Sequence, residues 1–370
     1  PTAVAAFVTT NSICQGQQAI DLWPIAFDRN CEIRFAYTSF KWANLATHNA
    51  GVTVIVVGLG KSSSLPKKIY EGELVKLCSV IGPYLAANSL ECVEKAKQPI
   101  GEQSMMIFGN MPRDGGNLVL DTELAEKISN EDPIAKSFIK RFVGSDELIN
   151  GLLRYCLWID DDQVNEAIKS PFIAKRLAMV AENRSQSNAE STRQFASQPH
   201  RFVQIAGTSE HTAIVVAAIS AESREYLPAI FVKNDTIVSN LALAVYDAPL
   251  WNFALISSRL HIVWIATVCG KLETRLRYSN SLGWNTFPLP PLTEKNKIDL
   301  TQSAEGILLA REAHFPDTLA ELYNPKNMPA DLREAHERND EVLERIYIGR
   351  RFRNDTERLE KLFDLYTEIT

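Results

Sequence analysis

Two stretches near the N-terminus decide the fold, FVTTNSICQGQQ (residues 7–18) and SFKWANLATHNAGVTVIVVG (residues 39–58). The first begins as an apolar run typical of a strand, and the residues that follow it up to position 27 show helical spacing. Residues 31–40 alternate apolar and polar side chains like a half-buried strand. The β-branched run at 52–59 is typical of a strand that is buried on both faces. The order strand, helix, strand, strand predicts the tail of an α/β sheet.

The central part of the chain combines short strands with helices. A helical pattern covers residues 122–150, and strand-like runs recur from FVQIA (202–206) to TIVSNLALAVY (236–246). Residues 251–270 have the pattern of one amphipathic helix. The polar segment 183–200 contains few apolar residues, and we interpret it as a mobile loop or a frayed helix. This mixture predicts an α+β region.

A proline-marked break, NTFPLPPL (285–292), separates this region from a remainder that is helical in period. A chain of 370 residues is long enough for two or three domains. We therefore predict a multidomain α/β and α+β protein with three parts. The sheet occupies 1–104, the mixed region occupies 105–290, and a helical domain occupies 291–370.

The charge distribution permits DNA binding but does not indicate it. The net charge is −6, whereas a protein that neutralises phosphates needs a basic face. Residues 171–290 hold 11 Lys and Arg against 8 Asp and Glu, and they are also rich in aromatic residues. This segment is the one part of the sequence in which a basic surface is expected.

Several other classes of protein are disfavoured. The six cysteines form no C-x-x-C pair, which argues against a zinc site or a disulfide framework and indicates a reducing cytoplasm. The six histidines never occur at metal-ligand spacing, so we predict no metal site. The apolar run 260–268 is far shorter than the roughly 20 residues of a membrane span. GLGKSSS (58–64) has Ile55 where a Walker A loop requires glycine, so we interpret it as a solvated turn.

The two stretches at the front resemble the region that follows the catalytic motif in bacterial DNA amino-methyltransferases of the MmeI-like class. Further segments resemble that class in the same order along the chain: FGNMPRDGGNL (108–118), RFVGSDELINGLLRYCLW (141–158), AESREYLP (221–228), YDAPLWNFALISSRLHIVW (246–264), RLRYSNSLGWNTFPLP (275–290) and LAELYNPKNMPADLREAH (319–336). The chain thus looks like the C-terminal part of a restriction-modification methyltransferase that is fused to its own specificity region. The resemblance implies a Rossmann-like methyltransferase sheet in 1–104 and a DNA target recognition domain in 105–290.

The resemblance assigns Phe40 and Trp42 to an aromatic face for the target base, with Tyr37 as a spare. An enzyme that modifies a base must flip it out of the duplex, at a cost of a few kcal/mol. Stacking on an aromatic ring recovers roughly 1–3 kcal/mol per base. Packing of both rings at the sheet edge is the alternative. Asn11 follows the end of a predicted strand, where α/β sheets bind ligands, and we expect it at the edge of the catalytic cleft unless it serves only as a turn residue.

The cofactor site is expected outside this chain. Neither the Asn-Pro-Pro-aromatic motif nor the glycine-rich loop for S-adenosylmethionine occurs in the 370 residues, and the resemblance places both upstream of Pro1. The complete protein is expected to transfer a methyl group directly from S-adenosylmethionine to adenine N6, with the exocyclic nitrogen of cytosine as the alternative. We expect the 370-residue chain alone to be inactive.

Double-stranded DNA is the expected partner. Glu222 and Arg224 are two residues apart, and on an extended segment both side chains would point the same way. A carboxylate accepting from cytosine and an Arg donating to guanine could then read one C·G pair in the major groove, unless the two form a surface ion pair. Arg275, Arg277 and Tyr278 form the densest cluster of cations and aromatic rings, which we expect to contact phosphates or bases rather than to be a solvated loop.

A second hypothesis is a DNA-binding specificity module without catalysis, from a restriction-modification or phage-exclusion system. The segments FVTTNS (7–12) and FKWAN (40–44) argue against it, because a pure reading module has no need of a methyltransferase tail. An N-terminal nuclease region of the same polypeptide is a further expected partner. No membrane association is expected.

Overall fold

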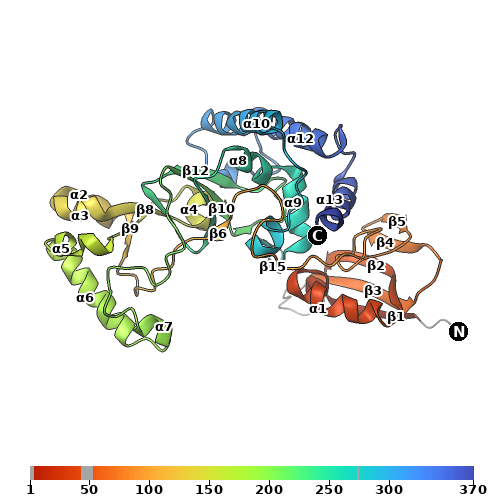
Figure 1. Ribbon diagram of the computed structural model, residues 1–370, viewed down its shortest axis with the longest axis horizontal. Coiled ribbons are helices and arrows are strands. Elements are labelled where there is room, and N and C mark those ends of the chain that lie inside the picture. Colours follow the sequence, from red (N-terminus) through yellow and green to blue (C-terminus); the bar gives the residue numbers. More distant parts are fainter. Residues whose placement is uncertain (1–3, 43–52, 273–274) are drawn as a thin grey trace.

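The structure is a computed structural model that describes residues 4–42, 53–272 and 275–370. The molecule is elongated, as Figure 1 shows. An N-terminal sheet lies at one end, a lobe built from residues 118–202 lies at the other, and a central sheet covered by the C-terminal helices joins them. Within the described ranges, no helix is both long and apolar enough to cross a bilayer.

The N-terminal sheet has five strands in the order β1-β3-β2-β4-β5. Their bounds are β1 (Val4–Thr10), β2 (Cys31–Lys41), β3 (Thr53–Lys61), β4 (Lys67–Glu71) and β5 (Leu74–Cys78). Among the described pairs, β2 with β4 is parallel and the others are antiparallel. A short 3-10 turn, η1 (Asn11–Cys14), and α1 (Gly16–Phe27) follow β1, and α1 buries Trp23 in the same core as Ile33. The predicted order of strand, helix, strand, strand is confirmed.

In the central sheet, the two middle strands are buried on both faces. Its order is β12-β10-β14-β6, with β10 (Thr212–Ala217), β12 (Ala229–Lys233), β14 (Ala242–Tyr246) and β6 (Ile107–Phe108), all antiparallel. Because side chains alternate along a strand, Ile214 and Val216 face the helices of the large core. Ala213 and Val215 face the opposite way and pack with Leu148 of α4 (Ser145–Asn150).

The lobe of residues 118–202 surrounds a sheet with the order β13-β8-β9-β7. Its elements are β7 (Val119–Asp121), α2 (Thr122–Glu131), α3 (Pro133–Phe138), β8 (Ile139–Val143), β9 (Arg154–Leu157), η2 (Asp161–Gln163), α5 (Val164–Ala167), α6 (Pro171–Ser185) and α7 (Glu190–Arg193), and β13 (Thr236–Val238) joins from the central part. The prediction that 122–150 is helical throughout was wrong at β8. This strand pairs with β9 and with β13, so partners distant in sequence override the local helical period.

The polar segment 183–200, for which the sequence predicts a mobile loop or a frayed helix, contains the end of α6, the whole of α7 and several turns. The Arg184 guanidinium is fully buried and donates hydrogen bonds to five backbone carbonyl oxygens. These belong to Pro112 (2.8 Å), Arg113 (3.0 Å), Phe195 (3.2 Å), Gln198 (2.9 Å) and Arg201 (2.7 Å). A planar fork with five donors can satisfy this many acceptors at once, so one side chain orders a segment that has few apolar residues.

Two further predictions need correction. Residues 251–270 form two helices, α8 (Trp251–Ile256) and α9 (Arg259–Val268), because the Ser258 hydroxyl accepts from the backbone of His261 and starts a new helix. All six residues of α8 are buried, so it is not amphipathic. FVQIA (202–206) is not a strand, and only Gln204 makes an isolated bridge, to Met111. The remaining short elements are β11 (Ile219–Ser220), β15 (Lys271–Leu272), β16 (Arg275–Arg277) and the π-helical turn η3 (Asn280–Trp284).

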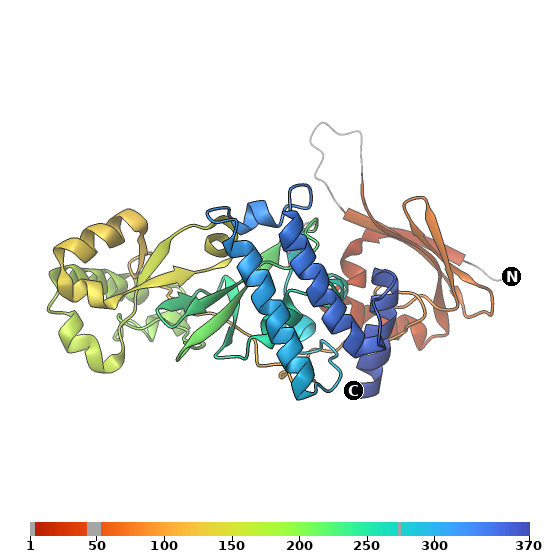
Figure 2. The ribbon, with the colours of Figure 1, turned by 90° about the horizontal axis from the view of Figure 1, so that it is seen from above.

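The C-terminal part is helical, as predicted. It comprises α10 (Glu294–Glu312), α11 (Leu319–Leu322), α12 (Ala330–Ile348) and α13 (Asp355–Ile369). The Thr293 side chain and Asn296 form a capping box at the start of α10, directly after the proline-marked break. Figure 2 shows α10 and α12 side by side across the central part of the molecule.

Two histidines are buried in the large core and are neutral. His336 Nδ1 donates to the Ser257 carbonyl (3.0 Å), and its Nε2 accepts from the Tyr323 hydroxyl (2.8 Å). His261 Nε2 lies 2.6 Å from the Tyr278 hydroxyl. Burial lowers the pKa of each imidazole to about 3, and the Arg311 cation lowers the pKa of His336 further in the same direction.

Replacing Arg184 with lysine is expected to unfold the segment that it holds. A single ammonium cannot reproduce five hydrogen bonds, so buried carbonyls lose their donors at a cost on the order of 3 kcal/mol. We expect new protease cleavage between residues 186 and 201 and a lower unfolding midpoint. Lys175→Ala, an exposed change on the same helix, is the control and should behave like the parent protein. Equal protease resistance of the Arg184→Lys protein would show that the guanidinium does not order the segment.

The neutral histidines predict that stability falls in mild acid. The unfolded imidazoles take up protons below their usual pKa of roughly 6.5, whereas the folded ones stay neutral down to a pKa of about 3. Each histidine therefore contributes its full stability above pH 6.5 and loses it below, by about 1.4 kcal/mol per pH unit. Asp340, whose pKa burial raises to about 7, contributes with the opposite sign below pH 7. Urea unfolding at pH 7.5 and 5.5 in an Asp340→Asn background therefore measures the fall that the histidines cause. NMR titration of the imidazole signals assigns the fall to the two buried histidines. His211→Gln, a change at an exposed histidine, is the control. A His336 signal that titrates near pH 6.5 would contradict the prediction.

Candidate nucleic-acid interface

Two of the predicted site segments meet at one edge of the N-terminal sheet. Val54, at the start of β3, pairs with Thr10 of β1 on one side and with Phe40 of β2 on the other. Residues that pair directly across strands point to the same face, and neighbouring strands lie about 4.8 Å apart. Thr10 and Phe40 are therefore about 10 Å apart on one face, with Asn11 and Trp42 at the same edge.

The aromatic residues at this edge are accessible. The Phe40 side chain is 39% exposed and that of Trp42 is 44% exposed, and their ring centroids lie 6.4 Å apart. Tyr37, the predicted spare, instead stacks on Tyr70 with a centroid distance of 4.3 Å and nearly parallel planes. Residues 43–52 of the segment that resembles the base-binding motif lie outside the described residues. The geometry leaves Phe40 and Trp42 as the rings that a planar ligand can reach.

Asn11 lies at the same end of the sheet as these rings and has an unused hydrogen-bond donor. Its side chain is 8% exposed, and its Nδ2 atom makes no hydrogen bond to any of the described residues. It follows β1 directly and begins η1, where the Thr10 and Ser12 hydroxyls bond to each other at 2.8 Å. A buried donor without a partner costs about 1–3 kcal/mol, so such an atom is suited to an acceptor on a ligand.

The loop that contains Glu222 and Arg224 is a turn and not an extended segment. The backbone nitrogen of Arg224 bonds to the Ala221 carbonyl (3.3 Å), which corrects the expected alternation. Glu222 forms an ion pair with Lys271 (2.7 Å), and Arg224 donates to the Ser220 hydroxyl (3.3 Å). Burial lowers the pKa of Arg224, although its guanidinium remains charged near neutral pH.

Both side chains nevertheless line one hollow of about 300 Å³, together with residues of α9, β15, β16 and α13. Lys271 and Arg259, which the sequence interpretation did not single out, line it as well. Lys271 stands in the same basic and aromatic stretch as Arg275, so that stretch contained a signal for it. The sequence contains no such signal for Arg259, because its place in the hollow depends on Asp355, which is 96 residues away along the chain and forms an ion pair with it.

Arg275 and Arg277 lie on β16 on either side of the buried Leu276, so both side chains point outward. Tyr278 does not join them. Its ring is buried and its hydroxyl bonds to His261, so the prediction that Tyr278 contacts DNA was wrong. The tyrosine sits one residue beyond the end of the strand, where the chain turns into the core.

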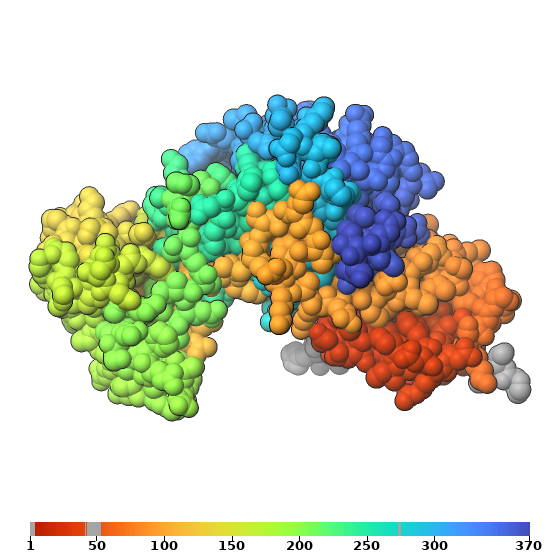
Figure 3. All heavy atoms as spheres, in the orientation of Figure 1, coloured from red at the N-terminus to blue at the C-terminus, as the bar shows by residue number. Residues whose placement is uncertain are grey.

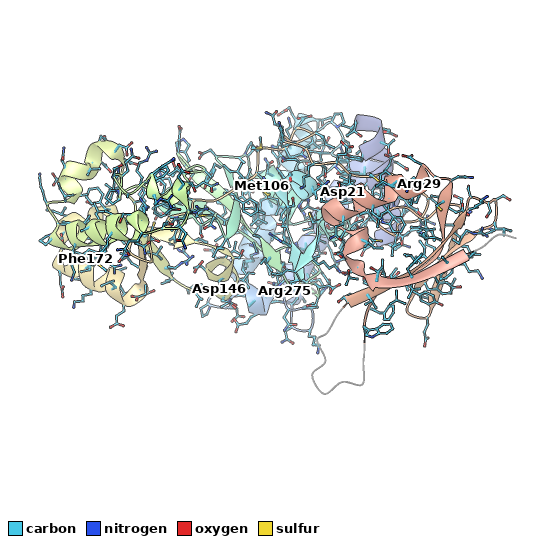
Figure 4. The ribbon with its side chains drawn as sticks, turned by 90° about the horizontal axis from the view of Figure 1, so that it is seen from below. Asp21, Arg29, Met106, Asp146, Phe172 and Arg275 are labelled. Atoms are coloured by element: carbon cyan, nitrogen blue, oxygen red, sulfur yellow. The ribbon has the colours of Figure 1, made fainter. Side chains whose placement is uncertain are left out.

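Figure 3 shows a broad concavity on the underside of the molecule, between the N-terminal sheet and the lobe of residues 118–202. Figure 4 views this side and places Arg275 between the N-terminal lobe, where Asp21 and Arg29 lie, and Asp146 of α4. In the described residues, no group of three or more His, Cys, Asp and Glu side chains could hold a metal ion.

Comparison with known proteins gives matches along the whole chain. Residues 1–71 match the family model described as MmeI, DNA-methyltransferase domain. Residues 87–291 match that of the MmeI target recognition domain, and residues 292–370 match that of the MmeI C-terminal domain.

DNA methyltransferase A of Bacillus subtilis (strain 168) is 40% identical over 370 residues, which are all of this chain and 42% of that protein. The Type IIL restriction-modification enzyme MmeI, solved in complex with DNA, superposes with a TM-score of 0.89 at 35% identity, over 99% of this chain and 50% of that one. The chain thus spans about half, or less, of the length of these relatives. The target recognition match alone covers more than half of the chain, and the chain therefore belongs to the MmeI family.

Proposed function

We propose that the complete protein is a site-specific DNA methyltransferase that modifies adenine at N6, and that this chain supplies the aromatic face for the target base and the sequence recognition. The match of residues 1–71 to a DNA-methyltransferase domain supports the activity, as does the 40% identity to a protein named DNA methyltransferase A. The likeness to MmeI, solved with DNA, supports double-stranded DNA as the partner.

One observation carries this proposal. The exposed rings of Phe40 and Trp42 and the unpartnered amide of Asn11 stand at the same end of the sheet. Rings that stack on a base and an amide that bonds to its edge are what a pocket for a flipped nucleotide requires. Asn11 and the two rings would orient the base, and this is the one step of the reaction that we assign to the described residues.

S-adenosylmethionine is the methyl donor in this proposal, and the described residues do not fit it. Gly58 and Gly60 lie within β3, and a Cβ on Gly58 would come within 2.1 Å of the Phe35 ring, so a side chain already fills the space beside that glycine. The donor would be bound mainly by residues upstream of Pro1. The exposed edge of β1, with Phe7 and Val8 on its surface, fits further strands of the same domain.

The DNA-reading residues in this proposal are Glu222, Arg224, Arg275 and Arg277. Glu222 and Arg224 share a hollow, and the two arginines of β16 present cations outward near it. Lys271 belongs to both groups, because it pairs with Glu222 and lies on the strand next to β16. Glu222 and Arg224 would contact base edges and so supply specificity. Arg275 and Arg277 would contact phosphates and so supply affinity.

We propose three domains, with the first boundary between residues 78 and 87 and the second at 290/291. Residues 96–104 hydrogen-bond to residues 281–287 of the central part, which favours an earlier boundary than 104. A reading module without catalysis is disfavoured, because the methyltransferase match covers 1–71. A nuclease region elsewhere in the polypeptide and a cytoplasmic location remain part of the proposal.

Loss of the aromatic face is expected to slow methylation in the complete enzyme. Stacking is worth roughly 1–3 kcal/mol, so Phe40→Ala or Trp42→Ala should lower kcat/KM by about tenfold or more, while Trp42→Phe should retain most of it. Methyl incorporation into cognate DNA gives the rate, and 2-aminopurine fluorescence at the target position reports flipping. Phe315→Ala, which removes an 86% exposed ring of the C-terminal domain, is the matched control. Unchanged methylation rates in both alanine variants would show that Phe40 and Trp42 do not form a face for the target base.

Exchanging the reading pair is expected to change the recognised sequence. The double change Glu222→Lys with Arg224→Asp reverses both charges, so the preferred base pair should change at one position and stay the same elsewhere. Sequencing of methylated sites in a random DNA library measures this. Glu334→Lys with Arg338→Asp reverses an exposed pair on α12 and should leave specificity unchanged. If the Glu222 and Arg224 double variant methylates the original sites only, the pair does not read DNA.

A further inference from the structure

The turn that contains Glu222 and Arg224 continues into two residues that are held by the C-terminal domain. The Glu225 carboxylate forms an ion pair with Arg333 of α12, with 2.5 Å between Oε2 and Nη1. The Tyr226 hydroxyl donates to the Asp340 carboxylate of the same helix at 2.9 Å. The Tyr226 ring also stacks on His336, with centroids 4.1 Å apart. One turn of the recognition domain is thus fixed at two adjacent residues by one helix of another domain.

Arg259 provides a second attachment for the same turn. Its Nη1 atom donates to the Glu225 carbonyl at 3.0 Å, and its backbone nitrogen donates to Asp340 at 2.7 Å. Its guanidinium also pairs with Asp355 at the start of α13. Arg259 and Asp355 line the hollow that Glu222 and Arg224 share. The wall of the reading hollow and the support of the reading turn are therefore made by the same side chains.

The contacts around Asp340 admit one geometry. The carboxylate is 4% exposed, and each of its oxygens has a defined donor, one from Tyr226 and one from Arg259. Hydrogen bonds from Tyr226 and Arg259 hold the group, and burial raises the pKa of Asp340 to about 7. A buried polar group that loses one partner leaves the other unsatisfied, which makes alternative loop positions costly.

Reading a base by hydrogen bonds requires side chains placed to within about 0.5 Å, which a surface turn does not provide by itself. The turn of residues 221–224 has few contacts of its own beyond the Ser220 and Lys271 side chains. The pairing of β11 with β16 fixes its N-terminal side, and the contacts of Glu225 and Tyr226 fix its C-terminal side, so its position depends on both anchors.

We propose that Tyr226, Arg333 and Asp340 are positioning residues for sequence recognition, through which the C-terminal domain sets the base that the Glu222 and Arg224 turn accepts without contacting DNA itself. The proposal rests on the reading role of that turn. It assigns to the C-terminal helices a part in specificity in addition to packing.

The test uses the complete enzyme and conservative changes. Tyr226→Phe removes one hydroxyl and keeps the stacked ring, and Arg333→Gln removes the ion pair with Glu225. Each should lower discrimination between the cognate base and the three others by about tenfold at the position read by the turn, because a well-aligned bidentate contact supplies discrimination of this order. Discrimination at other positions and non-specific DNA binding should change little, whereas the melting temperature of the Tyr226→Phe protein should fall by a few degrees because buried Asp340 loses one partner. Asp340→Asn, which can still accept from Arg259 and bond to Tyr226, should retain discrimination at that position.

The controls separate this inference from the function on which it rests. Arg338→Gln, on the exposed side of the same helix, should leave discrimination unchanged. In a background that has Glu222→Ala and Arg224→Ala, Tyr226→Phe should have no further effect on discrimination. If the exchanged reading pair changes the preferred base but Tyr226→Phe and Arg333→Gln do not alter discrimination, the positioning role is overturned and the reading role stands. A uniform loss of discrimination at every position also overturns the positioning role. If the exchanged Glu222 and Arg224 pair leaves the preferred base unchanged, both the positioning role and the reading role are overturned.

Discussion

The burial of β10 and β14, the middle strands of the central sheet, on both faces is the constraint on which the rest of the structure depends. Ile214 and Val216 of β10 pack into the core that contains α8, α9 and the C-terminal helices, whereas Ala213 and Val215 pack against α4. A sheet buried on both sides must be covered on both sides, so neither the C-terminal helices nor the α4 region can be detached without exposing it. The large core extends from these residues into the N-terminal sheet, so the N-terminal lobe is attached to the same centre.

Polar groups complete the junctions that apolar packing begins. Arg184 ties its own lobe to the loop at 112–113, Arg311 of α10 donates to Tyr323 and to the Ala229 carbonyl of β12, and Asp340 ties α12 to the recognition domain. Each of these side chains is buried and has several directional partners. Apolar contacts set which surfaces meet, while such groups set the angle and register at which they meet.

The sequence predicted elements whose patterns are local and missed those that depend on distant partners. The β-branched run of β3 and the acidic helices of the C-terminal domain were predicted correctly because each one matches a single period. β8 was missed because its partners β9 and β13 define it. Among the site residues, the exposure of Phe40 and Trp42 agrees with the face that was predicted for them. Tyr278 could not be assigned correctly, since nothing local shows that it bonds to a buried histidine.

If the proposed function holds, catalysis at one base and recognition of others occur at a fixed spacing along the duplex, and the contacts around α13 are suited to keep that spacing. Tyr84 stacks on Phe363 with centroids 5.9 Å apart, and Lys76 pairs with Glu360 at 3.1 Å. The same helix pairs through Asp355 with Arg259, which holds the recognition turn. One helix therefore contacts both the sheet that presents Phe40 and the support of Glu222 and Arg224. Because packed interiors deform little, these contacts hold the sheet that carries Phe40 and the turn that carries Glu222 and Arg224 in a fixed relation, as the proposed function requires.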